Sequence, residues 1–209
     1  MIRVAPEGRP FIAVAWLLVA VLAGVGQWWV LGIWLPLAVW VVAFFRDPER
    51  LGPRGVGLVL APADGKIVGI GTVDEPGYLG PAATRISIFM NVFNVHVNRY
   101  PAGGTVEYRH YHPGRFGNAG GDKASLDNEQ STLGLRSARG RLTVRQIAGL
   151  VARRIVTDHQ VGMQVIQGER MGLIRFGSRV DVFLPATARL LVQAGQRTVA
   201  GVTVVAQWD

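Results

Sequence analysis

The first part of the chain is an unbroken hydrophobic block. From Pro10 to Phe45 there is no Asp, Glu, Lys or Arg, and 30 of the 36 residues are apolar. A membrane-spanning helix needs about 20 apolar residues, and 36 residues would form a helix of roughly 54 Å. The glycines around Gly24–Gln27 offer a break, so we expect a helical hairpin with arms Pro10–Gly26 and Trp28–Phe45. A single long tilted helix, or a hairpin buried in a soluble core, are the alternatives.

The residues that flank this block indicate how it meets a membrane. Residues 1–9 contain Arg3 and Arg9, and arginines also follow the block at positions 46, 50 and 54. Positive flanks favour the cytoplasmic side of a membrane. We therefore expect residues 10–45 to associate with the inner (cell) membrane, with both ends and the remaining domain on the cytoplasmic side.

Residues 46–209 have a different pattern, in which short β-branched runs alternate with glycine and proline. Such a pattern is typical of strands joined by turns, and it predicts a mainly β domain built as a compact sandwich or barrel-like assembly. The segments Ala61–Val68 and Gly162–Ile174 resemble the strand-turn units of lipoyl-type hammerheads. Val144–Arg154 has some helical character, and the polar stretch His112–Gln130 is predicted to be a long loop. The expected strands are Gly57–Ala61, Lys66–Thr72, Ala83–Phe89, Gly104–Tyr111, Ser131–Ser137, Arg141–Ile147, Met163–Gln167, Arg179–Phe183, Ala188–Leu191 and Val202–Gln207.

Composition and charge narrow the class of protein. The chain has no cysteine, which excludes a disulfide framework and a cysteine-ligated metal site. Its net charge is +8, and all basic residues except Lys66 and Lys123 are arginine. The arginines are scattered through strand-like segments without a nucleic-acid-binding motif, so we expect no nucleic-acid partner and infer attraction to anionic lipid headgroups.

Three segments contain residues that could take part in catalysis. His96 lies among three asparagines in the otherwise apolar stretch Phe89–Pro101, which we expect to be a strand. Buried polar groups need partners, so this cluster suggests an organised polar site. Asp64 lies in a Pro-x-Asp-Gly turn, and Ser178 follows Gly177 in a β-rich segment without a Gly-x-Ser-x-Gly elbow.

The other histidines are weaker candidates. His110 and His112 are two residues apart, so they share one face of a strand and could contribute to a metal site. No third ligand has suitable spacing, and a pair of surface histidines is the simpler interpretation. His159 follows Asp158 in a turn and is expected to make local hydrogen bonds.

Taken together, the order and spacing of several motifs resemble the phosphatidylserine decarboxylase family in its short bacterial and archaeal form. Each motif is weak alone, but their joint presence is specific. The resemblance covers the hydrophobic hairpin and the segments Phe44–Pro48, Ala61–Lys66, Phe93–Arg99, Asp122–Glu129, Gln146–Arg154 and Gly172–Asp181.

This resemblance implies a proenzyme that cuts itself between Gly177 and Ser178. The products would be a β chain, residues 1–177, and an α chain, residues 178–209, which stay together as a heterodimer. Ser178 would become a covalent pyruvoyl group, which takes the place of a separate cofactor, and no metal is expected. The pyruvoyl ketone would form a Schiff base with phosphatidylserine, release CO2 and yield phosphatidylethanolamine.

The resemblance also implies roles for individual residues. Ser178 is the pyruvoyl precursor, and Asp64 and His96 match residues of a maturation triad with that serine. His96 could act in maturation, in protonation after loss of CO2, or in both. Residues on the substrate side are expected to include Lys123, Asn128 and Glu129, while Arg175 and Arg179 either contact phosphate or carboxylate or face solvent from a strand.

Two other classes of function compete with this hypothesis. A membrane-tethered lipoyl-like adaptor or carrier would need a modifiable lysine at a hairpin tip, for which Lys66 is the candidate. A zinc-dependent β-rich peptidase would use His110 and His112. Neither alternative accounts for the Gly172–Asp181 segment.

Overall fold

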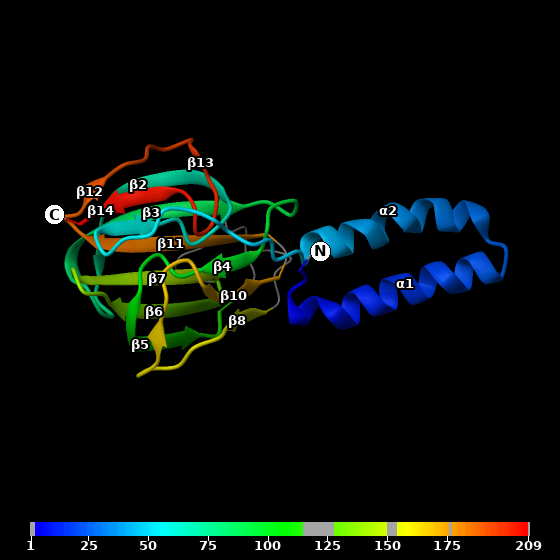
Figure 1. The fold of residues 1–209 in the computed structure, drawn as a ribbon, viewed down its shortest axis with the longest axis horizontal. Coiled ribbons are helices and arrows are strands. Elements are labelled where there is room, and N and C mark those ends of the chain that lie inside the picture. The colour runs from blue at the N-terminus through cyan, green and yellow to red at the C-terminus, as the bar shows by residue number, and fades with distance from the viewer. Residues whose placement is uncertain (1–2, 115–127, 150–153, 176, 209) are drawn as a thin grey trace. The chain divides into compact units, whose positions relative to one another are not determined.

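The computed structural model describes residues 3–114, 128–149, 154–175 and 177–208. The chain divides into two compact units, Met1–Glu49 and Arg50–Asp209. Each unit has its own type of secondary structure: the first is helical and the second is built from strands (Figure 1).

The N-terminal unit is a pair of helices joined by a short turn. A 3-10 turn, η1 (Pro6–Gly8), leads into α1 (Arg9–Gly24), and α2 (Trp28–Phe44) runs back beside it (Figure 1). Gly26 in the turn has a φ of +73°, a left-handed conformation that glycine adopts without steric cost. The predicted hairpin is therefore confirmed, and the alternative of one long tilted helix is wrong.

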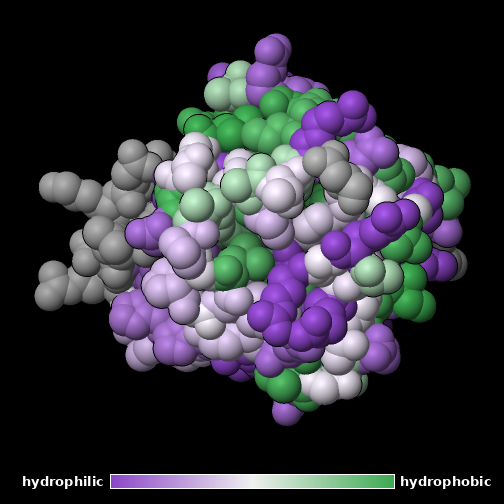
Figure 2. Space-filling view, turned by 90° about the vertical axis from the view of Figure 1, so that its left-hand side faces the viewer, coloured by the Kyte–Doolittle hydropathy of each residue, from purple (hydrophilic) through white to green (hydrophobic). Residues whose placement is uncertain are grey.

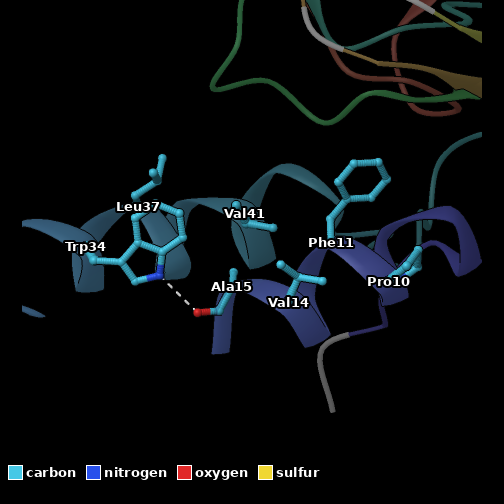
Figure 3. A pocket seen from close by; sticks show the side chains of 7 residues that line it. All are labelled: Pro10, Phe11, Val14, Ala15, Trp34, Leu37 and Val41. Atoms are coloured by element: carbon cyan, nitrogen blue, oxygen red, sulfur yellow. Dashed lines mark hydrogen bonds between the residues drawn. The ribbon is translucent and has the colours of Figure 1, made fainter. Parts of the chain in front are cut away.

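The two helices enclose an apolar groove. Trp34 of α2 donates a hydrogen bond from Nε1 to the backbone oxygen of Ala15 in α1, at 3.0 Å. Beside this bond lies a groove of about 450 Å³, visible in Figure 3, lined by Pro10, Phe11, Val14, Ala15, Trp34, Leu37 and Val41. Most other apolar side chains of the hairpin point outward; Leu17 is 65% and Ile33 is 71% exposed. Segment Pro6–Gly24 has the length and composition of a membrane span, while α2 is shorter.

The second unit is dominated by an eight-stranded sheet with all of its neighbouring strands antiparallel. Its central strand β11 lies between β3 and β7. The sheet order is β13 (Arg197–Thr198), β2 (Gly65–Glu75), β3 (Gly80–Met90), β11 (Ser178–Pro185), β7 (Arg141–Ala148), β6 (Gln130–Arg136), β5 (Gly104–His112) and β9 (Gln164–Val165).

Two three-stranded sheets complete the unit. One has the order β1 (Leu58–Leu60), β14 (Val204–Gln207) and β12 (Arg189–Leu190). The other has the order β4 (Val97–Arg99), β10 (Arg170–Ile174) and β8 (Ile155–Thr157). The hydrophobic core includes Val180 and Val182 of β11, Ile86 and Ile88 of β3, and Val144 of β7. The prediction of a mainly β domain is confirmed.

Some details of the sequence-based prediction are wrong. Val144–Ala148 is the end of strand β7 rather than part of a helix. Both faces of this strand are largely buried, so its apolar residues form a run that does not distinguish strand from helix. The short strands β8 and β13 have no counterpart among the expected strands, because segments of two or three residues carry little periodicity. Strands β4 and β10 were expected only as parts of the longer segments Phe89–Pro101 and Gly162–Ile174. On the face drawn in Figure 2, hydrophilic and hydrophobic residues are interspersed.

Candidate active site

Ser178 is the first residue of the central strand β11 and is fully buried. It pairs with Met90 at the end of β3 and with Ala148 at the end of β7. Its hydroxyl donates to the Sδ atom of Met90 at 3.4 Å. The preceding residue, Gly177, has a φ of +58°, in the left-handed region that favours glycine. A left-handed glycine therefore precedes Ser178, whose buried hydroxyl lies at one end of the sheet.

The register of the sheet brings the other two predicted residues to this same end. Strand β2 begins at Gly65, directly after Asp64, and lies beside the end of β3. His96 lies in the segment that follows Met90, the last residue of β3. Adjacent strands are about 4.8 Å apart, so the start of β2 is about 10 Å from Ser178 across the sheet.

His96 is held by the backbone on both sides. Its Nδ1 lies 3.0 Å from the backbone oxygen of Asn94, which can only accept, so Nδ1 carries the hydrogen and Nε2 is the basic nitrogen of the neutral ring. The backbone oxygen of His96 accepts from the N–H of Ile174, four residues before Ser178. The ring is fully buried. These contacts place a potential base beside the segment that ends in Ser178.

The expectation of a continuous strand through Phe89–Pro101 is wrong. Strand β3 ends at Met90, and β4 starts only at Val97. Asn91 Oδ1 accepts from the N–H of Phe93, and Asn94 Oδ1 accepts from the N–H of Asn91, both at 2.9 Å. Asparagine side chains that bind nearby backbone groups compete with strand pairing, so the same polar residues that indicated a site also interrupt the strand.

Asp64 is bound to partners other than the histidine and the serine. One carboxylate oxygen, Oδ2, lies 2.7 Å from Nη2 of Arg50, and the other, Oδ1, accepts from the N–H of Ala200 at 2.8 Å. The structure thus brings Asp64 to the end of the sheet where Ser178 lies. Its carboxylate there binds Arg50 and the backbone N–H of Ala200.

Two of the predicted substrate-side residues lie beside the serine. Ala148, which pairs with Ser178, donates its N–H to the backbone oxygen of Glu129 and accepts at its own oxygen from the Asn128 amide. The buried Glu129 carboxylate accepts from the hydroxyl of Tyr111 at 2.9 Å, and this hydrogen bond raises the pKa of Tyr111. Among the described residues, Oε2 of Glu129 accepts no hydrogen bond. Lys123 lies outside the described residues.

The two arginines close to Ser178 in sequence, Arg179 and Arg175, differ in their burial and in their hydrogen-bond partners. Arg179 is buried and forms two hydrogen bonds to Asp181, from Nε and Nη2, each at 2.8 Å. The alternative of a solvent-facing Arg179 is wrong, because both faces of β11 are covered. Arg175 is half-buried, and its N–H donates to the backbone oxygen of Arg154.

The residues proposed for competing functions do not have the surroundings that those functions require. Lys66 is inside strand β2, paired with Phe89, so it does not occupy the hairpin tip that a carrier lysine requires. His110 and His112 are exposed near the end of β5. In the described parts of the chain, no three His, Asp or Glu residues are grouped as metal ligands. His159 accepts from or donates to the Tyr100 hydroxyl at 2.9 Å, a contact far apart in sequence rather than local.

A chain of hydrogen-bonded side chains next to Ser178, most of them buried, has no clear signature in the sequence. It connects strands of the large sheet to the small β4-β10-β8 sheet. The only signal in the sequence was the group of asparagines around His96, one of which, Asn98, belongs to the chain. Its members are Ser131, Thr157, Gln146, Asn98 and Met90.

Comparison with known proteins places most of the sequence in the family that the motifs resemble. The family model described as phosphatidylserine decarboxylase matches residues 37–206. A phosphatidylserine decarboxylase proenzyme of Azorhizobium caulinodans is 52% identical over 206 residues, which cover 97% of this chain and 88% of the relative. Proenzymes of the same name from Cupriavidus pinatubonensis and Aromatoleum aromaticum are 48% and 50% identical, and the alignments cover 99% and 97% of this chain and 95% and 94% of the relatives. The chain therefore belongs to the phosphatidylserine decarboxylase family, a family of carboxy-lyases.

Proposed function

We propose that this protein is a self-processing, pyruvoyl-dependent decarboxylase that converts phosphatidylserine to phosphatidylethanolamine and CO2. The observation that carries the proposal is the position of Ser178. It is a buried serine directly after a left-handed glycine, at the sheet end from which His96 and Asp64 also extend. Membership of the family supports the choice of substrate.

Maturation begins with the hydroxyl of Ser178. After a base takes its proton, Oγ attacks the carbonyl carbon of Gly177, the peptide C–N bond breaks, and an ester replaces the amide. A base then removes the proton on Cα of residue 178, the Cβ–Oγ bond breaks, and its electron pair leaves with Oγ as the carboxylate of Gly177. Water hydrolyses the resulting dehydroalanine, which releases ammonia and leaves a ketone at the new N-terminus.

His96 is the candidate base for these proton transfers. Its Nδ1–H is held by a backbone carbonyl, which directs the basic Nε2 away from that contact. In decarboxylation the same nitrogen would return a proton to the substrate carbon. Asp64, held by Arg50 and Ala200, would orient the loop at this end of the sheet.

The buried position of Ser178 suits the group that would be made from it. A pyruvoyl ketone supplies Schiff-base chemistry, in which the carbonyl carbon accepts the amine of the headgroup and the conjugated system takes the electron pair left by CO2. The chain's own residues would exclude water from residue 178 and hold the headgroup. Asn128 and Glu129, anchored to Ala148, are the candidates on the substrate side, together with Lys123 and Arg175.

The two products of cleavage would remain one folded unit. Residues 178–209 contain β11, which lies between β3 and β7, and β14, which pairs with β1. These are strands of the proposed α and β chains interleaved in the same sheets, and their separation would expose core residues such as Val180 and Val182. We therefore propose a heterodimer that is stable without the peptide bond at 177–178.

The helical hairpin would bring this unit to its lipid substrate. A lipid headgroup is presented only at a membrane surface, and residues 10–45 form helices with exposed apolar side chains. We propose that the hairpin embeds in the cell membrane and that the catalytic unit, residues 46–209, acts on the cytoplasmic side.

Intact-mass measurement of the purified protein tests the proposal. We expect two fragments, one ending at Gly177 and one starting with a pyruvoyl group, and decarboxylation of phosphatidylserine vesicles. The Ser178→Ala variant should remain a single chain without activity, whereas Ser137→Ala, which changes a serine in the turn before Gly140, should be cleaved normally. An intact, unmodified chain that decarboxylates phosphatidylserine would refute the proposal.

A further inference from the structure

The buried polar chain beside Ser178 has a defined direction. The hydroxyl of Thr157 donates to Oε1 of Gln146 at 3.0 Å. Its single hydrogen is then used, so the 2.8 Å contact between Ser131 Oγ and Thr157 Oγ1 requires Ser131 as the donor. Each step therefore points from Ser131 toward Gln146.

This direction determines how the Asn98 amide is oriented. With its oxygen occupied by Thr157, Gln146 turns its Nε2 toward Oδ1 of Asn98, at 2.8 Å. Asn98 must then direct its NH2 group the other way, and Nδ2 lies 3.6 Å from Sδ of Met90. Asn98 and Gln146 are both buried, so water does not offer an alternative set of partners.

The chain ends at an acceptor that it shares with the reacting serine. Met90 Sδ accepts a hydrogen bond from Nδ2 of Asn98 at 3.6 Å and another from the hydroxyl of Ser178 at 3.4 Å. A thioether is a weak acceptor. Both donors therefore have a buried partner that binds them weakly, and the amide could exchange the sulfur for a more strongly accepting atom at little cost.

Such an atom arises at Ser178 during the proposed self-cleavage. We propose that Asn98 Nδ2 donates a hydrogen bond to Oγ of residue 178 when the Cβ–Oγ bond breaks; this inference rests on the proposed function. In that step a base takes the Cα proton, Cα and Cβ become doubly bonded, and the electron pair of the broken bond leaves on Oγ as the Gly177 carboxylate. Negative charge thus develops on an oxygen that shares the sulfur contact with the Asn98 amide, and a donor oriented in advance stabilises developing charge.

The isosteric variant Asn98→Asp isolates this role. It keeps an oxygen to accept from Gln146 but replaces the Nδ2 donor with an acceptor. Loss of one such donor slows a reaction by about 100- to 1000-fold, so we expect chain cleavage on a denaturing gel to slow by that factor. Because formation of the ester does not need this donor, the ester should accumulate. Hydroxylamine should then cleave the stalled chain and release a fragment that begins with an unmodified serine.

Gln146→Glu is a second variant, which leaves Asn98 in place but reverses its orientation. A carboxylate offers only acceptors, so the NH2 group of Asn98 would turn toward it and the carbonyl toward Met90. We expect the same stalled ester. A matched control is Asn91→Asp, whose side-chain oxygen still accepts from the N–H of Phe93, and its cleavage rate should not change.

The outcomes separate this inference from the proposed function. Normal cleavage of Asn98→Asp, or slow cleavage without an ester that hydroxylamine can trap, would overturn the role of Asn98. A cooperative thermal transition in each variant shows that folding is retained, and if Asn98→Asp does not fold, Gln146→Glu decides by the same two criteria. Cleavage of Ser178→Ala at the 177–178 bond would instead overturn the proposed function itself.

Discussion

The surroundings of Ser178 bear on the reactivity that we propose for its hydroxyl. The oxygen is buried against a thioether, which does not take its proton, so the hydroxyl stays neutral until a base reaches it. His96 enters from the segment after β3 and has its proton on the nitrogen held by Asn94. At this scale, the proposed reactivity depends on hydrogen-bond partners held by β3, by β11 and by the segment between β3 and β4.

Tyr78 is a residue at which hydrogen bonding and burial predict a pH effect. Burial and the hydrogen bond that its hydroxyl donates to Glu107 raise its pKa from 10.0 to about 12. The folded state therefore keeps this proton at a pH where the unfolded chain loses it. The contribution of Tyr78 to the free energy of unfolding is fully present below pH 10 and is lost as the pH rises toward 12.

Urea unfolding at alkaline pH measures this contribution. We expect the stability difference between the wild-type protein and Tyr78→Phe to shrink as the pH rises through that range. Other tyrosines titrate in both proteins, so the difference isolates Tyr78. A difference that is independent of pH would contradict the assignment.

At the scale of elements, the start of β2 explains the Asp64-Gly65 pair. A Cβ atom on Gly65 would lie 2.2 Å from the backbone oxygen of Phe89 and 2.9 Å from Cγ2 of Ile88. The glycine therefore permits β2 to approach β3 closely, and this approach places Asp64 at the end of the sheet. What looks like an ordinary turn signal is a requirement of strand packing.

The Gly65→Ala variant tests this requirement. Because the clash is with backbone, the strands must move apart, and such overpacking costs about 1–3 kcal/mol in the free energy of unfolding. Gly69→Ala on the same strand is the matched control, since its Cβ would meet nothing within 4 Å. Chemical denaturation should show a loss for Gly65→Ala only; equal stability of the two variants would show that β2 adjusts without cost.

At the scale of the whole molecule, the division into two units separates the hydrophobic helices from the residues proposed for catalysis. The residues proposed for catalysis all lie in Arg50–Asp209, whereas the long uncharged segment lies in Met1–Glu49. We infer that a change in the hairpin should alter membrane binding without disturbing the sheet end around Ser178.

Charged residues on the exposed side of the hairpin test this separation. A charge at the centre of a membrane helix costs about 2.5–3.5 kcal/mol, so Leu17→Asp and Ile33→Asp should each weaken co-sedimentation with phospholipid vesicles about 100-fold. Val68→Asp, at a 46% exposed position on β2, is the control and should bind as the wild type does. Self-cleavage should continue in all three variants. Unchanged vesicle binding of both hairpin variants would argue against insertion of the hairpin.

The features of this protein that depend on local pattern can be predicted from the amino-acid sequence alone. The uncharged run of 36 residues with a glycine break predicts two helices, because length and turn residues suffice for that inference. Alternating β-branched runs predict most of the longer strands. The motifs indicated Ser178, His96 and Asp64 because the segments that contain them resemble those of the phosphatidylserine decarboxylase family.

Which side chains contact each other depends on the fold of the whole chain. The short strands β4 and β10 pair with each other and with the equally short β8, which are segments far apart in the sequence, and no local pattern encodes that pairing. The partners of Asp64 are Arg50 and Ala200, and the buried chain from Ser131 to Asn98 joins residues from four strands. Hydrogen bonds between distant segments depend on sheet register and on burial, which are properties of the folded chain as a whole.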